Sequence, residues 1–156
     1  MDDQVRETIN TFLAQYDTLA IATEDQGQPY VTRAFYVEQP VHDTNLTLYG
    51  TFITTSRKLA NLRQNPRVGI FIGPSQPTAW LEATAEAHII TDEQASASVR
   101  EQLSRKSAVA GAFIARLPVV AVELRVNWLR ITNIAAQPMQ TEASFTIAPT
   151  KEAEKV

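Results

Sequence analysis

The stretch TTSRK at residues 54–58 combines three hydroxyl side chains with two cations at the expected start of a short helix. Ser56 is suited to cap that helix, so Arg57 and Lys58 fall in its first turn. The positive end of the helix dipole opposes cations there, at a cost of about 0.3–1 kcal/mol each when they are exposed. Backbone amides, hydroxyls and cations together would bind an anion such as a phosphate. The alternative is an ordinary capped surface helix with solvated cations.

The composition excludes several other kinds of site. The chain has 156 residues, of which 44% are apolar and 20% charged, as expected for one globular domain. Its net charge of −3 argues against nucleic-acid binding through bulk electrostatics. The lack of cysteine excludes disulfides, a thiolate nucleophile and cysteine metal ligands. His42 and His88 have no partners at ligand spacing, so no metal site is expected, and His42-Asp43 alone does not make a hydrolytic triad.

The terminal segments of the sequence are polar. MDDQVRETIN is unlike a signal peptide, and no apolar run approaches the length that spans a membrane. We therefore expect a cytoplasmic protein without a membrane partner. Residues 1–136 are expected to form a single domain. Residues 137–156 have little apolar periodicity, which predicts a loosely docked or mobile tail, and its part from about Thr141 onward is expected to be dispensable for folding.

The spacing of apolar residues predicts short strands with helices at the margins. Helices are expected at 5–16, between Ser56 and Asn65-Pro66, from the capping box TDEQ at 91–94 to about 104, and at 107–116. Strands are expected at 19–23, 30–37, 46–49, 67–73, 79–90, 119–126 and 128–132. The continuously apolar run RVGIFIG at 67–73 is expected to be buried on both faces. Antiparallel hairpins without βαβ alternation predict a mainly β fold, a closed or nearly closed antiparallel barrel.

Three motifs occur in the sequence in the same order as in a known protein family. GQPY at 27–30, SRK at 56–58 and NPRV at 65–68 occur in sequence at nearly the separations seen in the pyridoxamine 5'-phosphate oxidase-like family. The chain resembles these FMN-binding split barrels over about residues 12–133. The resemblance implies a six-stranded antiparallel split β-barrel with flanking helices. It also implies a homodimer that binds two FMN molecules in clefts at the subunit interface.

The resemblance assigns roles to particular residues. Arg57 and Lys58 match the cations that hold the FMN phosphate, with Ser56 beside them. The strand that contacts the flavin ring matches Thr32, Arg33, Ala34, Phe35, Tyr36 and Val37. The strand end that approaches the phosphate and ribityl chain matches Tyr49, Gly50 and Thr51. Four aromatic side chains could wall a substrate slot beside the ring: Phe35, Tyr36, Trp80 and Trp128.

The sequence departs from the oxidases at three places. Their arginine and lysine at the two ends of the ring-contacting strand fall on Thr32 and Val37. Arg33 is one position away, and a shift of one residue along a strand points a side chain to the opposite face. The loop GTFITT is about two residues longer than its counterpart, and the chain lacks the arginine-bearing substrate segment at its end. These departures argue against vitamin B6 oxidation.

The sequence leads to a flavin hypothesis with alternatives. Because a flavin accepts hydride itself, its protein needs no acid–base dyad or nucleophile, and the sequence shows none. The first hypothesis is an FMN-dependent oxidoreductase that acts on a small molecule and accepts electrons from a reductant such as a nicotinamide cofactor. The second is a non-catalytic protein of the same fold that binds flavin, deazaflavin or haem as a carrier, sensor or stress protein. The third is a dimeric scaffold without a cofactor.

Overall fold

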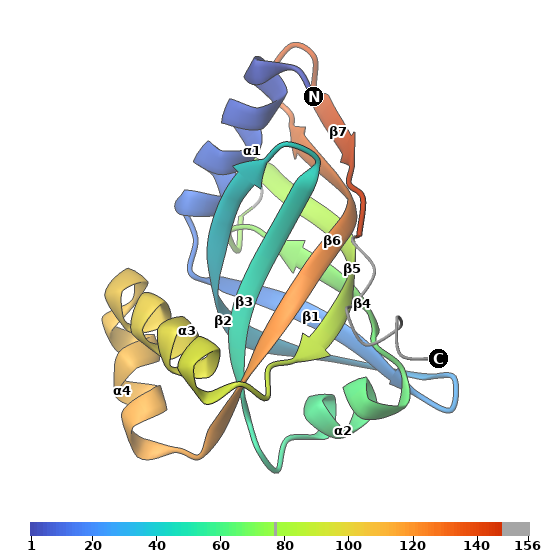
Figure 1. Ribbon diagram of the computed structural model, residues 1–156. Helices are drawn as coiled ribbons and strands as arrows, with labels where there is room; N and C mark the ends of the chain where they lie inside the picture. Colours follow the sequence, from blue (N-terminus) through green and yellow to red (C-terminus); the bar gives the residue numbers. More distant parts are fainter. Residues whose placement is uncertain (77, 148–156) are drawn as a thin grey trace.

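The computed structural model describes residues 1–76 and 78–147, and a closed ring of six antiparallel strands forms its centre (Figure 1). The ring runs in the order β3-β2-β1-β4-β5-β6, and pairing between β3 and β6 closes it. Its strands are β1 (Thr18–Asp25), β2 (Gln28–His42), β3 (Asn45–Ile53), β4 (Arg67–Ile72), β5 (Ala79–Ile89) and β6 (Val119–Asn133). This ring confirms the predicted six-stranded barrel with flanking helices.

The helices lie around the barrel: α1 (Asp3–Ala14), α2 (Arg57–Gln64), α3 (Glu93–Lys106) and α4 (Ala108–Arg116). In Figure 1, α1 and α2 lie toward opposite ends of the barrel, while α3 and α4 lie together beside β2. None of the helices in the described ranges is long and apolar enough to cross a membrane. The two short helices after β5 were predicted as separate segments, and the structure confirms both.

Each strand of the ring has an inner and an outer face, because successive side chains alternate. The inner faces form the main core together with α1, whose Ile9 and Leu13 are fully buried. On β2, Ala34 and Tyr36 belong to this core. Phe35 and Val37 lie on the outer face, against a second cluster formed by α3 and Ala121 of β6. The outer face of β2 is therefore the side available to a ligand.

Two details of the predicted elements are wrong. Asp92, rather than Thr91, caps α3, since its carboxylate accepts a hydrogen bond from the Ala95 amide at 2.8 Å. The run at 67–73 is not buried on both faces, because Phe71 on the outer face of β4 is 43% exposed.

The segment expected to be a mobile tail is instead part of the sheet as far as it is described. Residues Gln140–Ser144 form β7, which pairs with β6. Phe145 is only 7% exposed and belongs to the main core. Its burial argues against the prediction that everything beyond about Thr141 is dispensable for folding, which a deletion would test. Residues 148–156 lie outside the described ranges.

Candidate functional site

The helix start that the sequence singled out has the predicted geometry. The Leu59 amide donates a hydrogen bond to Ser56 Oγ at 3.4 Å, so Ser56 is the N-cap of α2. Leu59 and Leu62 are buried and hold the helix on the barrel, and Asn65 ends it. The first turn of α2 has no acidic side chain, so nothing within it compensates Arg57 and Lys58.

A cavity of about 180 Å³ opens beside this helix start, between the outer face of the sheet and α4. β2 and β3 form its floor, Lys58 of α2 one wall and Phe113 of α4 another. Eight residues line it: Thr18, Arg33, Ala34, Phe35, Thr51, Ile53, Lys58 and Phe113. Five of them (Arg33, Ala34, Phe35, Thr51 and Lys58) are among the residues matched to a flavin site from the sequence.

Lys58 brings an uncompensated positive charge to the cavity. Its ammonium lies 5.2 Å from the centre of the Phe52 ring, and the side chain is half-buried. Burial lowers the pKa of this amine, because the charged form loses hydration. No carboxylate among the described residues pairs with it. A bound anion would supply the missing charge.

Thr51 supplies a second unsatisfied group. The residue is only 4% exposed, and its Oγ1 has no hydrogen-bond partner among the described residues. A buried hydroxyl without a partner costs about 1–3 kcal/mol, so a folded protein holds only a few such groups. Thr51 and Lys58 line the same cavity, one with an unused donor and the other with an unpaired cation. This pair of groups fits the phosphate or ribityl chain of a flavin.

The structure separates the other matched residues on β2 and β3 from the cavity. The Tyr36 hydroxyl donates to the Leu13 carbonyl oxygen at 2.7 Å, on the opposite face of β2 from Phe35. Thr32 pairs in register with Ile21 and does not line the cavity. The Tyr49 hydroxyl donates to Gln39 Oε1 at 3.1 Å, away from the cavity.

Gly50 contributes through the space it leaves. A Cβ at this position would meet the Phe35 carbonyl oxygen at 3.1 Å. Gly50 therefore lets β3 lie close to β2, which brings Thr51 of β3 to the same floor as Phe35 of β2.

Arg57 and Trp80 also lie outside the cavity. The Arg57 guanidinium stacks on the ring of Tyr30, 4.8 Å from its centre, and the side chain is exposed. Trp80 lies near Gly73, at the opposite end of β5 from Glu86, which pairs with Arg67 just after α2. Within one chain, Trp80 therefore does not wall this cavity.

Sequence reasoning missed Phe113, which forms the wall opposite the sheet. Its ring meets the Phe35 ring edge-on at a centroid distance of 5.9 Å. A signal was present, because α4 has the sequence AVAGAFIAR, apolar on every side. Such a helix should be buried, yet only Ala110 is.

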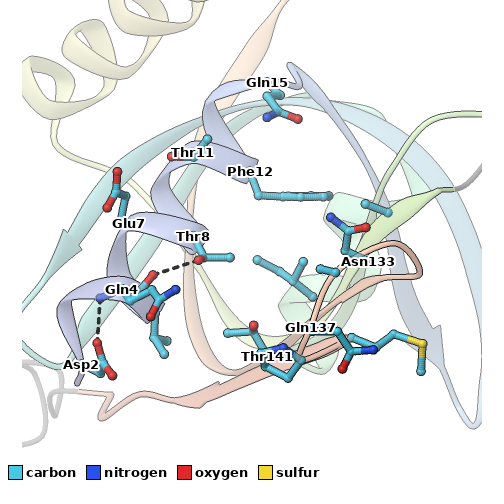
Figure 2. Close-up of a pocket in the computed structure, with 16 residues that line it drawn as sticks. Asp2, Gln4, Glu7, Thr8, Thr11, Phe12, Gln15, Asn133, Gln137 and Thr141 are labelled. Atoms are coloured by element: carbon cyan, nitrogen blue, oxygen red, sulfur yellow. Dashed lines mark hydrogen bonds between the residues drawn. The ribbon is translucent and has the colours of Figure 1, made fainter.

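A larger cavity of about 700 Å³ lies elsewhere, between α1 and the segment that joins β6 to β7 (Figure 2). Gln4, Thr8 and Phe12 face Asn133, Gln137 and Thr141 across it. Its described lining contains two carboxylates and no cation, so it offers no charge complement to a phosphate. The smaller cavity at Lys58 is the better candidate for an anionic ligand despite its size.

Comparison with known proteins identifies a family over most of the chain. Residues 5–134 match the family model described as pyridoxamine 5'-phosphate oxidase. None of the curated proteins compared with the chain matches it.

Solved structures share the fold at low sequence identity. A candidate pyridoxamine 5'-phosphate oxidase from Listeria innocua has a TM-score of 0.66 at 20% identity, over 83% of this chain and 98% of that one. A heme-binding protein from Mycobacterium smegmatis has a TM-score of 0.67 at 19% identity, over 90% of this chain and 57% of that one. A FAD-binding protein from Mesorhizobium loti has a TM-score of 0.59 at 19% identity, over 80% of this chain and 90% of that one.

Proposed function

The chain belongs to the pyridoxamine 5'-phosphate oxidase family, and on that premise we propose that it binds FMN in the cavity beside α2. The phosphate binds Lys58, and the flavin ring lies along the outer face of β2 beside Phe35. The observation that carries this proposal is the pair of unsatisfied groups, the Lys58 amine and the Thr51 hydroxyl, at one cavity. A phosphate satisfies the amine, and the ribityl hydroxyls or phosphate oxygens satisfy the hydroxyl.

Two further cations near the cavity, Arg57 and Arg33, lie at different ends of the proposed flavin site. Arg57 is one position from Lys58 and reaches the phosphate only by leaving the face of Tyr30. Arg33 lines the cavity from β2, exposed and without an acidic partner among the described residues. Since Arg33 projects from the same strand face as Phe35, it faces the ring side of the site rather than the barrel core. Arg33 would thus provide on the ring side the positive charge that Thr32 does not carry.

We propose that the protein is an oxidoreductase acting on a small molecule. Bound FMN supplies the hydride-accepting centre, so the chain needs only to hold it and leave one face open. The lining contains two aromatic rings and an isoleucine but no acid–base dyad, as expected of a site in which the flavin performs the chemistry and the protein only binds it.

Haem is the alternative raised by the Mycobacterium smegmatis neighbour, whose description names heme binding. Haem iron is held by an axial His, Cys, Met or Tyr side chain. None of these residue types occurs in the described lining of the cavity. The cavity therefore favours a flavin or deazaflavin, which share the phosphate end, over haem.

A homodimer is the proposed assembly, and the outer face of β1, β2 and β4 supports it. Ala22 of β1 pairs with Val31 on one side and Gly69 on the other. Val31 is 65% exposed. Phe71, two residues beyond Gly69 on β4 and paired with Ala20, is 43% exposed. This apolar face adjoins Arg33 at the rim of the cavity, so a second copy seated on it would extend the flavin site. We expect an interface above about 1,000 Å².

The test is a titration of the purified protein with FMN, followed by addition of a nicotinamide reductant. Quenching of flavin fluorescence together with bleaching of the flavin absorbance would support an oxidoreductase. Binding without bleaching by NADH or NADPH would favour the non-catalytic alternative. The absence of FMN binding at micromolar concentrations would overturn the flavin assignment.

A further inference from the structure

The larger cavity, hereafter the α1 cavity, lies at the α1 end of the barrel (Figures 1 and 2). Ala79 at the start of β5 pairs with Asn133 at the end of β6, so the two strands end together beside this cavity. Its volume of about 700 Å³ falls within the range of about 300–1,000 Å³ that small-molecule sites occupy. The mouths of β-barrels are common positions for such sites, so size and position both suit a small ligand.

The base of the α1 cavity is apolar. Phe12 of α1 is 6% exposed and Ile131 of β6 is 4% exposed, and both belong to the main core. Val5 and Ala79 also line the cavity and pack against that core. A ligand resting on this base has to turn an apolar side toward it, because a polar group placed there would lose water without gaining a partner.

The walls of the α1 cavity are polar but uncharged where they face each other. Gln4 and Thr8 of α1 face Asn133, Gln137 and Thr141 across the cavity (Figure 2). Side-chain amides and hydroxyls can both donate and accept hydrogen bonds. The side chains of Gln4, Gln137 and Thr141 have no hydrogen-bond partner among the described residues, so these groups are available to a ligand.

These walls differ from other exposed helix surfaces in the molecule. On α3, Arg100 bonds to Glu93 at 2.6 Å, and on α1 itself Arg6 pairs with Asp3 at 3.3 Å, outside the lining of the cavity. The side of α1 over the cavity instead repeats neutral residues at helical spacing. These residues are Gln4, Thr8, Thr11 and Gln15. The described ion pairs are thus kept out of the cavity, and neutral hydrogen-bonding groups gather at it.

Two carboxylates border the cavity and determine the charge of a ligand that fits it. Asp2 is engaged as the N-cap of α1, because its Oδ1 accepts a hydrogen bond from the Gln4 amide at 2.7 Å. The Glu7 carboxylate points away from the opposite wall (Figure 2). With no cation in the described lining, these two negative charges repel an anion. An uncharged ligand therefore fits better than a phosphate or a carboxylate.

The wall opposite α1 is held in place by hydrogen bonds. The Asn133 amide donates to the Met139 carbonyl oxygen at 2.8 Å, and Asn133 Oδ1 accepts from the Ala135 amide at 3.1 Å. The Ile134 amide donates to the Thr78 carbonyl oxygen at 3.1 Å. These bonds fix the connection between β6 and β7, so a ligand meets a formed site and does not have to order a loop.

We propose that the α1 cavity is a second ligand site, separate from the flavin cavity, that binds a nucleoside. A nucleoside is uncharged and combines a flat ring with several hydroxyl groups. Its ring lies on the apolar base at Phe12 and Ile131. The amides of Gln4, Asn133 and Gln137 hydrogen bond to its ring edge and its ribose. Because α1 and α2 lie toward opposite ends of the barrel, the site is occupied independently of FMN (Figure 1).

An NMR titration of the full ¹⁵N-labelled chain tests the proposal. Adenosine, cytidine and uridine are added at millimolar concentration, with and without FMN. At least one nucleoside should shift the amide resonances of α1 and of residues 133–141, to the same extent in both conditions. No shift in these segments with any of the three would overturn the site. Shifts at α2 and β2 that FMN abolishes would place the nucleoside in the flavin cavity and would also overturn it.

A filling variant checks the location of the binding. Thr8→Tyr places a ring between the two walls and should reduce the affinity for the nucleoside that binds best by at least about tenfold. Ala14→Tyr introduces the same ring at an exposed position of α1 outside the lining and is the matched control, which should bind as the wild type does. Equal affinities of the two variants would contradict binding in this cavity.

The charge of the ligand provides the last test. The 5'-monophosphate of the same nucleoside should bind at least about tenfold more weakly, because its phosphate meets two carboxylates. Asp2→Asn/Glu7→Gln removes both charges and keeps a capping residue on α1, so it should bring the two affinities within about threefold of each other. A monophosphate that binds the wild type as tightly as the nucleoside would overturn the preference for an uncharged ligand.

Discussion

Lys58 and Lys106 are both partly buried against an aromatic ring, but their surroundings satisfy only one of them. The Lys106 ammonium bonds to the Glu38 carboxylate and donates to the Leu13 carbonyl oxygen at 3.1 Å. It also lies 4.0 Å from the centre of the Tyr36 ring. Among the described residues, the Lys58 ammonium has only the Phe52 ring, at 5.2 Å, and burial lowers its pKa.

The difference distinguishes a structural cation from one kept for a ligand. Lys106 joins three elements, because its partners lie on α1 and β2 while the residue itself is on α3. Lys58 loses hydration without a carboxylate partner in the part of the chain that the structure describes, which makes the ligand-free protein less stable than it could be. Perturbed, unpaired charges of this kind cluster at functional sites. We therefore expect the same substitution to have opposite effects at the two lysines.

The largest effect is expected from removing the cations of α2. Arg57→Ala/Lys58→Ala should lower FMN affinity by at least about 100-fold, since each charge-assisted contact contributes about 1.5–3 kcal/mol. Without FMN, the variant should be equally stable or more stable by up to about 1 kcal/mol, because two cations leave the positive end of a helix. Fluorescence titration and thermal melting measure the two effects. Arg63→Ala, which removes an exposed cation from the last turn of the same helix, is the control for a general charge effect and should retain FMN affinity.

The same substitution at the two lysines should produce opposite results. Lys106→Met leaves Glu38, which is 15% exposed, without its partner and should lower the free energy of unfolding by about 2 kcal/mol. Its FMN affinity should stay within about threefold of wild type. Lys58→Met should leave stability unchanged or higher and weaken FMN binding. Urea denaturation of both variants checks the stabilities, and equal destabilisation of the two would remove the distinction between them.

The pH dependence of FMN binding should report the Lys58 amine. Burial lowers its pKa in the free protein, whereas a bound phosphate raises it, so binding takes up a proton in the alkaline range. FMN affinity should therefore fall as pH rises through the lowered pKa, by up to about tenfold per pH unit. Lys58→Arg should remove this dependence, because a guanidinium stays charged. An unchanged alkaline profile in that variant would assign the titration to another group.

The smallest effect is expected at Thr51. Thr51→Val removes a buried hydroxyl without a partner and should raise the free energy of unfolding by about 1 kcal/mol. FMN affinity should fall about three- to tenfold, because one hydrogen bond to the ligand is lost. Thr47→Val, at an outer-face position on the same strand but outside the cavity, is the control. A loss of stability in Thr51→Val would mean that its hydroxyl already has a structural role.

Much of the frame of the site could be predicted from the sequence. Ser56 capped its helix as expected because capping depends on a local hydrogen bond. The order of strands followed from turn residues and apolar runs, which are also local signals. Which residues of β2 face the ligand was harder to predict. The resemblance matched the whole stretch to the flavin strand and so grouped Phe35 with Tyr36, but side-chain alternation places them on opposite faces of the strand.

The parts that the sequence did not reveal depend on contacts between distant segments. Phe113 meets Phe35 across 78 positions of chain, and no local pattern encodes that approach. β7 is short and polar, with no apolar period, and is ordered because it adds to the edge of β6 and is followed by the buried Phe145. Trp80 looked suited to a flavin wall by residue type alone, and only the strand register shows that it lies at the other end of β5.

A crystal structure of the protein grown with FMN tests the central claim most directly. We predict a phosphate oxygen within about 3 Å of Lys58 Nζ and the flavin ring against Phe35 on the outer face of β2. The Lys106–Glu38 pair should be unchanged in that complex. FMN bound instead in the cavity between α1 and β7, with Lys58 still unpaired, would contradict the account.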